Sequence, residues 1–297
     1  MVAEAPQLLQ RARALLPPLE GGREDLLLPL YQGLVLIVLR LAAEKTLVPL
    51  LRSYLKSRPA SAGAKPPDRR AHEVVDNAFL TAVIAPLCAW GWWVMLYHNG
   101  PCTPVSTAGC LVGWPDLPVT SQFRWWWLSV GGLYAGEMIG TLIGGVGFKL
   151  SAEMMVHHAV TTVLMLYGYY GGLHRYGQMA TTVLDSSNTL LHAAKAAHAM
   201  GLPALEGVSG AMFKLFALTF FIVRVVMPPG CMLWPGIKYG TALPTATYYT
   251  TNGLMFVIYA LQIMWFYKIA RIAIGGDKEH HAKPAAAAAA VAGAKTD

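Results

Sequence analysis

Seven long apolar stretches are the feature that most limits what this chain can fold into. Each is close to the roughly 20 residues that an α-helix needs to cross the hydrocarbon core of a bilayer. Only 13% of the 297 residues are charged, whereas soluble domains carry about 25%. The stretches are residues 26–50, 74–97, 124–147, 152–170, 177–199, 206–227 and 249–273.

These stretches predict helices rather than strands. None of them alternates apolar and polar residues with period two, which a membrane β-barrel would require. Inside lipid every backbone polar group needs an internal partner, and a helix supplies one. We therefore predict an all-α fold, a polytopic membrane helical bundle with about seven transmembrane helices. The first stretch differs from the others, because Arg40, Glu44 and Lys45 make its second half amphipathic.

Lysine and arginine are unevenly distributed between the links. They gather in residues 51–73 and again after residue 267. Short loops rich in these residues stay on the cytosolic side of a membrane. This predicts a cytosolic C-terminus and a lumenal N-terminal segment, residues 1–25. The net charge of +7 then reflects membrane orientation and gives no indication of a nucleic-acid partner. The Ala-rich tail, residues 276–297, is predicted to be disordered and cytosolic.

Two cysteines share one predicted lumenal link. Cys102 and Cys110 both lie between the second and third stretches, and Cys231 lies in the predicted link after the sixth. An oxidising lumen allows a Cys102–Cys110 disulfide. Two free thiols remain the alternative, because spacing alone does not establish a pair.

The third stretch has two features of its own. Gly136, Gly140 and Gly144 recur every four residues, a spacing that permits close helix contact. We expect this contact within the chain, with a contact between two copies as the alternative. Glu137 lies in mid-stretch and is expected to face the bundle interior, where a structural hydrogen bond and a substrate contact are both open.

The fourth and fifth stretches carry polar side chains at depths where contact with hydrocarbon is costly. These are His157, His158 and Thr161 in the fourth stretch, and Asp185, Asn188, His192 and Lys195 in the fifth. On a helix the polar positions of each stretch fall mainly on one face. Since a short link makes the two helices neighbours, we expect the two faces to enclose a polar chamber inside the membrane.

Such a chamber permits proton transfer or nucleophilic attack. An imidazole beside a carboxylate is held in one tautomer and is the better base for it. It could activate an amine or hydroxyl toward an acyl thioester, or accept the acyl group itself. The alternative is structural, because His and Asn also join transmembrane helices by hydrogen bonds. No metal site is expected, since adjacent histidines point about 100° apart on a helix.

These residues resemble the TLC domain, and in particular its ceramide synthase branch. The motif of that branch has the form EMxxHHxxTxxL followed by HDxSDxxLExAK. The chain matches it at Glu153, Met154, His157, His158, Thr161, Leu164, Asp185, Ser187, Leu191 and Lys195. Similar residues recur at Trp114-Pro115, Arg224, Gln262, Trp265-Phe266 and Arg271, so the resemblance spans roughly residues 30–272. The chain departs from the branch at Leu184, Asn188 and His192, where the synthases have histidine, aspartate and glutamate.

The resemblance implies a TLC-type transmembrane domain over residues 26–275 in the endoplasmic reticulum membrane. The implied activity is a ceramide synthase-like N-acyltransferase, which moves a fatty acyl group from acyl-CoA to the amine of a sphingoid base. Catalytic roles would fall to His157, His158 and Asp185. Substrate contacts would fall to Asn188, His192, Lys195, Thr161, Tyr169, Arg224 and Gln262.

The same resemblance sets the expected partners. They are membrane lipids, a long-chain base and fatty acyl-CoA; the acyl-CoA is a co-substrate, and no cofactor or metal is implied. A homodimer stays open. The competing interpretation is a non-catalytic TLC protein that binds lipid or regulates membrane lipid composition.

Overall fold

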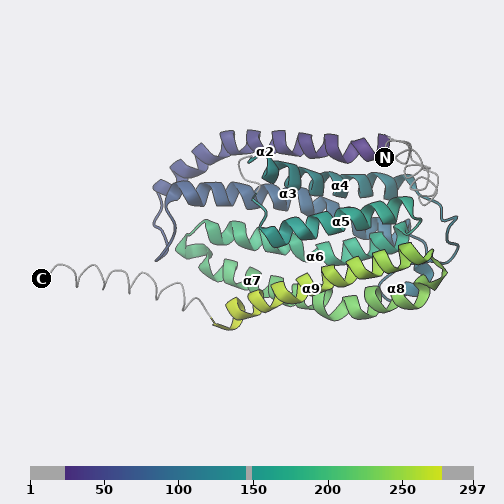
Figure 1. The fold of residues 1–297 in the computed structure, drawn as a ribbon. Coiled ribbons are helices and arrows are strands. Elements are labelled where there is room, and N and C mark those ends of the chain that lie inside the picture. Colours follow the sequence, from purple (N-terminus) through teal and green to yellow (C-terminus); the bar gives the residue numbers. More distant parts are fainter. Residues whose placement is uncertain (1–23, 145–148, 276–297) are drawn as a thin grey trace, which may run out of the picture.

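Helices make up nearly all of the chain that the computed structural model describes, residues 24–144 and 149–275 (Figure 1). They are α2 (Glu24–Lys56), α3 (Pro67–Tyr97), α4 (Ser121–Leu142), α5 (Ala152–Tyr170), α6 (His174–Ala199), α7 (Glu206–Phe220), α8 (Trp234–Tyr239) and α9 (Thr245–Gly275). No β-strand occurs within these residues, so the predicted all-α fold is confirmed. The predicted N-terminal segment, up to residue 23, and the predicted tail, 276–297, lie outside the described residues.

Successive long helices run in opposite directions along one bundle axis (Figure 1). One end of the bundle, here called the basic end, holds the α2–α3 link (residues 57–66) and the start of α5. The other, the disulfide end, holds the α3–α4 link, in which Cys102 and Cys110 form a disulfide. Of the two alternatives for these cysteines, the structure therefore has the bonded pair.

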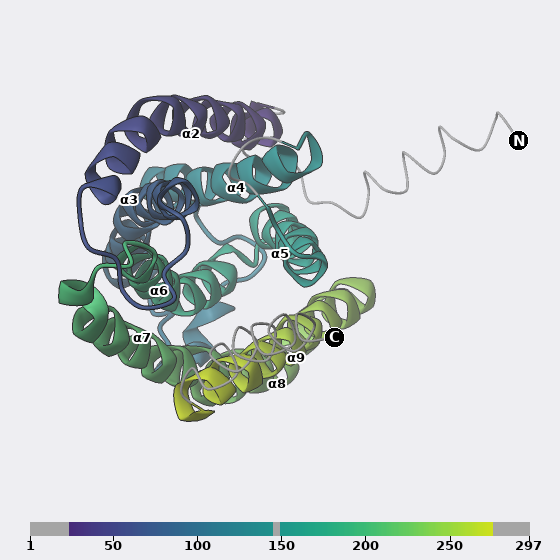
Figure 2. The ribbon, with the colours of Figure 1, turned by 90° about the vertical axis from the view of Figure 1, so that its left-hand side faces the viewer.

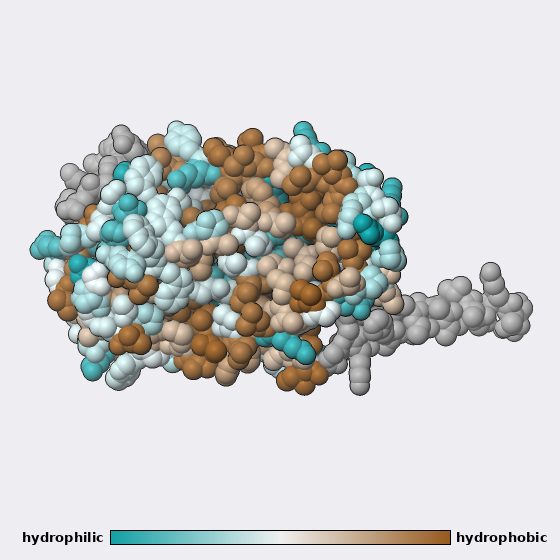
Figure 3. All heavy atoms as spheres, turned by 180° about the vertical axis from the view of Figure 1, so that it is seen from behind, coloured by the Kyte–Doolittle hydropathy of each residue, from teal (hydrophilic) through white to brown (hydrophobic). Residues whose placement is uncertain are grey.

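The outer surface suits a lipid environment. Four helices are long and apolar enough to cross a membrane: 25–56, 67–97, 203–242 and 245–274. On the face seen from behind, apolar side chains gather over the middle, and hydrophilic ones gather toward the two ends (Figure 3). The chain thus has the character of a multi-pass membrane protein, while the count of seven spans stays a prediction.

Local sequence fixes where α4 and α5 begin and where α5 ends. The Thr120 and Ser151 hydroxyls accept hydrogen bonds from backbone N–H groups of the first turns of α4 and α5, at 3.2 and 3.4 Å. Such caps satisfy donors that a helix start leaves free. Between α5 and α6, Gly172 adopts φ +70°, a conformation that favours glycine. These signals place the turn from α5 into α6 and set the two helices side by side.

The sixth predicted helix ends in the wrong place. We expected it to stop at residue 227, where the apolar stretch ends, and Cys231 to lie in the following loop. Instead the chain stays helical through two π-helical turns, Phe221–Val226 (η3) and Pro229–Leu233 (η4), into α8. A π turn accommodates residues that an α-helical hydrogen-bond pattern cannot. Arg224 accordingly lies in the middle of a long helical segment.

Helix α2 packs on the outside of α4 (Figure 2). The contact is close because Gly33 meets Gly136, where a Cβ on Gly33 would lie 2.7 Å from the Gly136 backbone nitrogen. At the disulfide end, Arg124 of α4 forms an ion pair with the buried Asp25 of α2. The glycine contact predicted in the third stretch is thus intramolecular at Gly136, whereas among the described residues nothing lies within 4 Å of a Cβ built on Gly144.

Candidate functional site

A cavity that is partly open to the outside lies inside the bundle. Side chains from α4, α5, α6, the α7–α8 segment and α9 line it, the helices that surround the interior when viewed from the basic end (Figure 2). Most of its wall is apolar. A group of polar side chains meets it at one place, namely Tyr134, His157, Thr161, Asp185 and Arg224. An apolar pocket with a few convergent polar groups is the usual form of a small-molecule site.

His157 is the histidine on the cavity wall. Its side chain is 7% exposed, and its Nδ1 atom has no hydrogen-bond partner within the described residues. The ring of Trp265, 5.3 Å away and edge-on, fixes one side of the imidazole. A buried ring nitrogen without a protein partner is costly unless a ligand or water meets it. The cavity that His157 lines can hold such a partner.

His158 is held differently, by two partners at once. Its Nδ1 atom lies 2.8 Å from the Met154 carbonyl oxygen, and its Nε2 atom lies 2.7 Å from a carboxylate oxygen of Glu137. A carbonyl oxygen can only accept, so Nδ1 carries a hydrogen. One further proton is then shared between Nε2 and Glu137. The pair is either imidazolium with carboxylate or neutral imidazole with carboxylic acid.

Asp185 projects from α6 onto the same cavity. The Tyr134 hydroxyl donates to its Oδ1 atom at 3.3 Å, and the Asn188 amide donates to the same oxygen at 3.0 Å. Between His157 and Asp185, among the described residues, no direct hydrogen bond is recorded. Tyr134 lies near both, since its ring centroid is 6.4 Å from that of His157.

Arg224 supplies the positive charge that faces Asp185, with 3.8 Å between the two charged groups. Its guanidinium also donates to side chains of α6 and α9 and to one α6 carbonyl. The acceptors are the Leu184 carbonyl (2.8 Å), Ser187 (2.8 Å), Gln262 (2.9 Å) and Asn188 (2.7 Å). A buried charge is tolerated in this way, paired and with its donors used. Asn188 and Gln262 therefore support the site from behind.

Five of the predicted substrate contacts do not line the cavity. Asn188 and Gln262 bond to Arg224 behind it, and the other three have different surroundings. His192 bonds across to Asn77 of α3, with 3.0 Å between Nδ1 and Oδ1. Lys195 is exposed near the end of α6, at the basic end. Tyr169 donates to Asp25 of α2 at 2.6 Å, toward the disulfide end. The structure thus brings together His157, Thr161, Asp185 and Arg224, with His158, Asn188 and Gln262 next to them.

Sequence reasoning missed Tyr134 as a site residue and left the role of Glu137 open. The two lie three residues apart on α4, one turn from each other, and both turn toward the histidines of α5. The carboxylate of Glu137 in mid-stretch was the signal that could have identified Tyr134, because a residue three positions away lies on the same helix face.

The chemistry available here is acid–base chemistry and binding of a polar group deep in the bundle. Within residues 24–144 and 149–275 no three His, Cys, Asp or Glu side chains gather closely enough to hold a metal ion. An imidazole with an unpartnered nitrogen can take a proton from a bound group. The Tyr134 hydroxyl and the Arg224 charge lie where they can meet a polar group in the cavity.

Comparison with known proteins finds several relatives that are named ceramide synthase or ASC1-like protein. Human ceramide synthase 4 is 30% identical over 181 residues, which are 60% of this chain and 44% of that protein. Ceramide synthase LOH1 of Arabidopsis thaliana is 25% identical over 170 residues, 54% of each chain. ASC1-like protein 3 of rice (Oryza sativa subsp. japonica) is 25% identical over 181 residues, 59% of this chain and 63% of the relative. The chain spans about half the length of the curated relatives it matches.

The family model of the TLC domain matches residues 75–271. That region starts within α3, contains α4 to α8 and ends within α9, so it includes every helix that contributes to the cavity. The chain therefore belongs to the TLC domain family.

Proposed function

We propose that the chain is a ceramide synthase-like N-acyltransferase, which transfers a fatty acyl group from acyl-CoA to the amine of a sphingoid base. The observation that carries the proposal is His157, whose Nδ1 atom is buried without a partner among the described residues and borders the cavity that Asp185 also lines. The relatives named ceramide synthase supply the substrate class.

In the proposed reaction, the amine nitrogen attacks the carbonyl carbon of the thioester. The new carbon–nitrogen bond forms as the carbon–sulfur bond breaks, and CoA leaves as a thiol after taking a proton. His157 removes the amine proton as general base, or first accepts the acyl group itself. Asp185 and Tyr134 orient the polar groups of the substrate, and the His158–Glu137 pair exchanges protons beside them.

The proposed setting is the endoplasmic reticulum membrane, with the disulfide end of the bundle in the lumen and the C-terminus in the cytosol. Lys and Arg at the basic end support this orientation. The disulfide supports it as well, since an oxidising compartment sustains such a bond.

Membranes from cells that express the chain test this proposal. Given a sphingoid base and acyl-CoAs of several lengths, they are expected to form N-acylated base above the level of vector membranes. His157→Ala, His158→Ala and Asp185→Ala are each expected to lower the rate by about 10²–10⁴-fold, the usual contribution of a positioned acid or base. His72→Ala, at an exposed position on α3, is the matched control and should leave the rate unchanged.

The second candidate is a non-catalytic TLC protein that binds lipid in the same cavity. It is favoured by the way Asn188 and Arg224 tie Asp185 into a network internal to the bundle. The departures at Leu184, Asn188 and His192 point in the same direction. If the unmutated chain forms no product at any acyl length, the acyltransferase proposal is wrong and the lipid-binding alternative replaces it.

A further inference from the structure

The cavity continues from the polar group toward the disulfide end. His157 and Gly168 of α5 both line it, and with 1.5 Å of rise per residue they lie ~16 Å apart along the helix. Leu173, before the start of α6, and Leu111, in the α3–α4 link, also line it. This arm of the cavity, from residue 157 to residues 111 and 173, is therefore long as well as deep.

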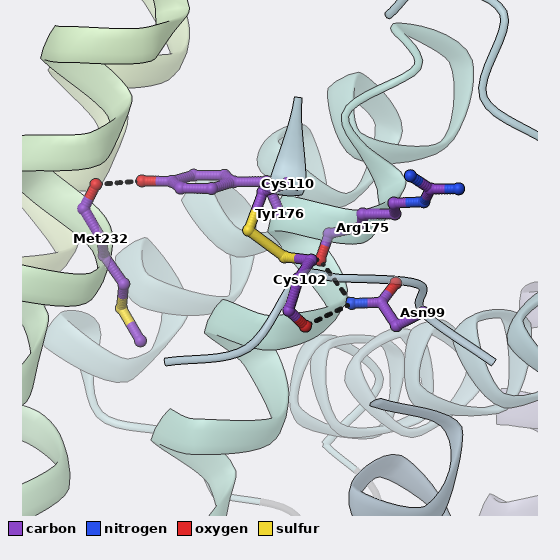
Figure 4. Close-up of a disulfide and its surroundings, with 6 residues drawn as sticks. All are labelled: Asn99, Cys102, Cys110, Arg175, Tyr176 and Met232. Atoms are coloured by element: carbon purple, nitrogen blue, oxygen red, sulfur yellow. Dashed lines mark hydrogen bonds between the residues drawn. A yellow bond between two sulfur atoms is a disulfide. The ribbon is translucent and has the colours of Figure 1, made fainter. Parts of the chain in front are cut away.

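The arm offers little to a polar ligand. Three of its polar side chains donate their hydrogens to backbone carbonyls of the protein. Tyr176 donates to Met232 (Figure 4), Thr251 to Thr247 at 2.7 Å, and Asn252 to Tyr248 at 2.9 Å. The remaining contacts at this end come from side chains such as Leu111, Met165, Leu173 and Leu243. The matching ligand is an unbranched hydrocarbon chain, whose burial is favourable by about 0.8 kcal/mol for each methylene.

Leu111 is held in place on both sides. The residue before it, Cys110, is bonded to Cys102, whose sulfur lies 3.3 Å from the Arg175 carbonyl oxygen at the start of α6 (Figure 4). Asn99 donates to the same carbonyl at 3.0 Å. Three residues after Leu111, the indole of Trp114 donates to the Gly171 carbonyl at 2.9 Å. The link cannot withdraw from the cavity without breaking one of these connections.

We infer that Leu111, fixed by the disulfide and by Trp114, closes the apolar arm of the cavity and sets the longest acyl chain that the site accepts. The inference rests on the proposed function for the identity of the substrate. The neighbouring Val112 is 63% exposed and does not line the cavity. The α3–α4 link therefore provides Leu111, which would contact the acyl chain, and Val112, which would not.

The test measures the product profile of the full chain in membranes with saturated acyl-CoAs that differ by two carbons from one to the next. Leu111→Ala should raise the relative kcat/KM for the acyl chain just beyond the wild-type limit by ~10-fold, the effect of two further buried methylenes. Leu111→Phe should shorten the limit, and Val112→Ala should leave it in place. Opposite shifts from two variants of one residue are not produced by general damage to the fold.

An unchanged length profile in both Leu111 variants, with product still formed, would overturn the inference while leaving the proposed function standing. If the wild-type chain forms no product, the proposed function fails and binding decides the inference. The purified full chain is then labelled with fatty acids of increasing length that carry a photoreactive diazirine at the methyl end. Label in residues 111–114, with a length limit that shifts in Leu111→Ala, supports the inference. Label elsewhere, or an unshifted limit, overturns it.

Discussion

Tyr134 connects two halves of the site that the sequence keeps apart. Its hydroxyl donates to Asp185 of α6, and its ring lies against His158 of α5 with 4.7 Å between centroids. A hydroxyl that holds a half-buried carboxylate in one position also lowers the freedom of that carboxylate to turn away from a ligand. Preorganised donors of this kind act at the reacting groups without further reorganisation.

Tyr134→Phe is therefore expected to lower kcat for N-acylation by ~10–100-fold while the amount of folded protein stays the same, because it deletes one donor and keeps the ring. The measurement is the initial rate in membranes at matched protein level. Tyr170→Phe is the control, since the Tyr170 hydroxyl is buried and has no partner among the described residues. Equal rates in Tyr134→Phe and the wild type would remove Tyr134 from the mechanism.

At the scale of residues, the sequence predicts which side chains belong to the site better than it predicts the direction in which each side chain points. His157 and Asp185 were predicted to share a chamber, and both line the cavity. Tyr169 was predicted as a substrate contact, and it lies three steps of four residues from His157, yet it bonds to Asp25. Each step of four turns a helix by 400°, so three steps drift by ~120°. Tyr134 could not be placed, because the rotation of α4 against α5 is a tertiary property.

At the scale of helices, α2 stands apart from the family match. It ends before residue 75, where the match begins, yet it packs along α4 through Gly33 and Gly136. The face of α4 that it covers is the one with Gly132 and Gly136, and Asp25 adds an ion pair at one end. We interpret α2 as the helix that shields this side of α4 from lipid.

Gly33→Leu is expected to destabilise the protein by ~1–3 kcal/mol, because the new side chain would meet the backbone of α4, which cannot yield locally. The measurement is thermal unfolding in detergent. Gly253→Leu on α9 is the matched control, since no atom of the described part of the chain lies within 4 Å of a Cβ at that position. A loss of stability in Gly253→Leu as large as that in Gly33→Leu would contradict this explanation.

The predicted helices agree with the structure where local signals decide their ends. Ser151 and Gly172 mark the start and end of the fourth predicted helix, and its bounds are those of α5. The sixth predicted helix ended at residue 227, whereas the helical segment continues, because a π turn depends on how a segment packs against its neighbours, which no local pattern records.

For the whole molecule, the two ends of the bundle differ in a way that supports the proposed orientation. The basic end carries the α2–α3 link, and the disulfide end carries the closed loop of Cys102 and Cys110. If the proposed orientation holds, only the disulfide end meets the glycosylation enzymes of the lumen. The chain has no Asn-x-Ser/Thr acceptor of its own, so an engineered acceptor reports on its own position.

Pro104→Asn completes an acceptor with Ser106 at the disulfide end, and Pro59→Asn completes one with Ser61 at the basic end. We expect the first variant to gain a glycan and the second to gain none. The measurement is a gel shift that an endoglycosidase reverses. A glycan on Pro59→Asn, with none on Pro104→Asn, would reverse the orientation.

The pairing of Asp185 with Arg224, and of His158 with Glu137, has a consequence for energetics across the membrane. The net charge of each pair is zero, whichever group of the second pair carries the shared proton. A voltage acts on net charge moved through the bilayer, at about 2.3 kcal/mol for each elementary charge per 100 mV. The groups around the cavity therefore carry almost no net charge on which a transmembrane potential could act. The rate of turnover should be the same in polarised and depolarised vesicles.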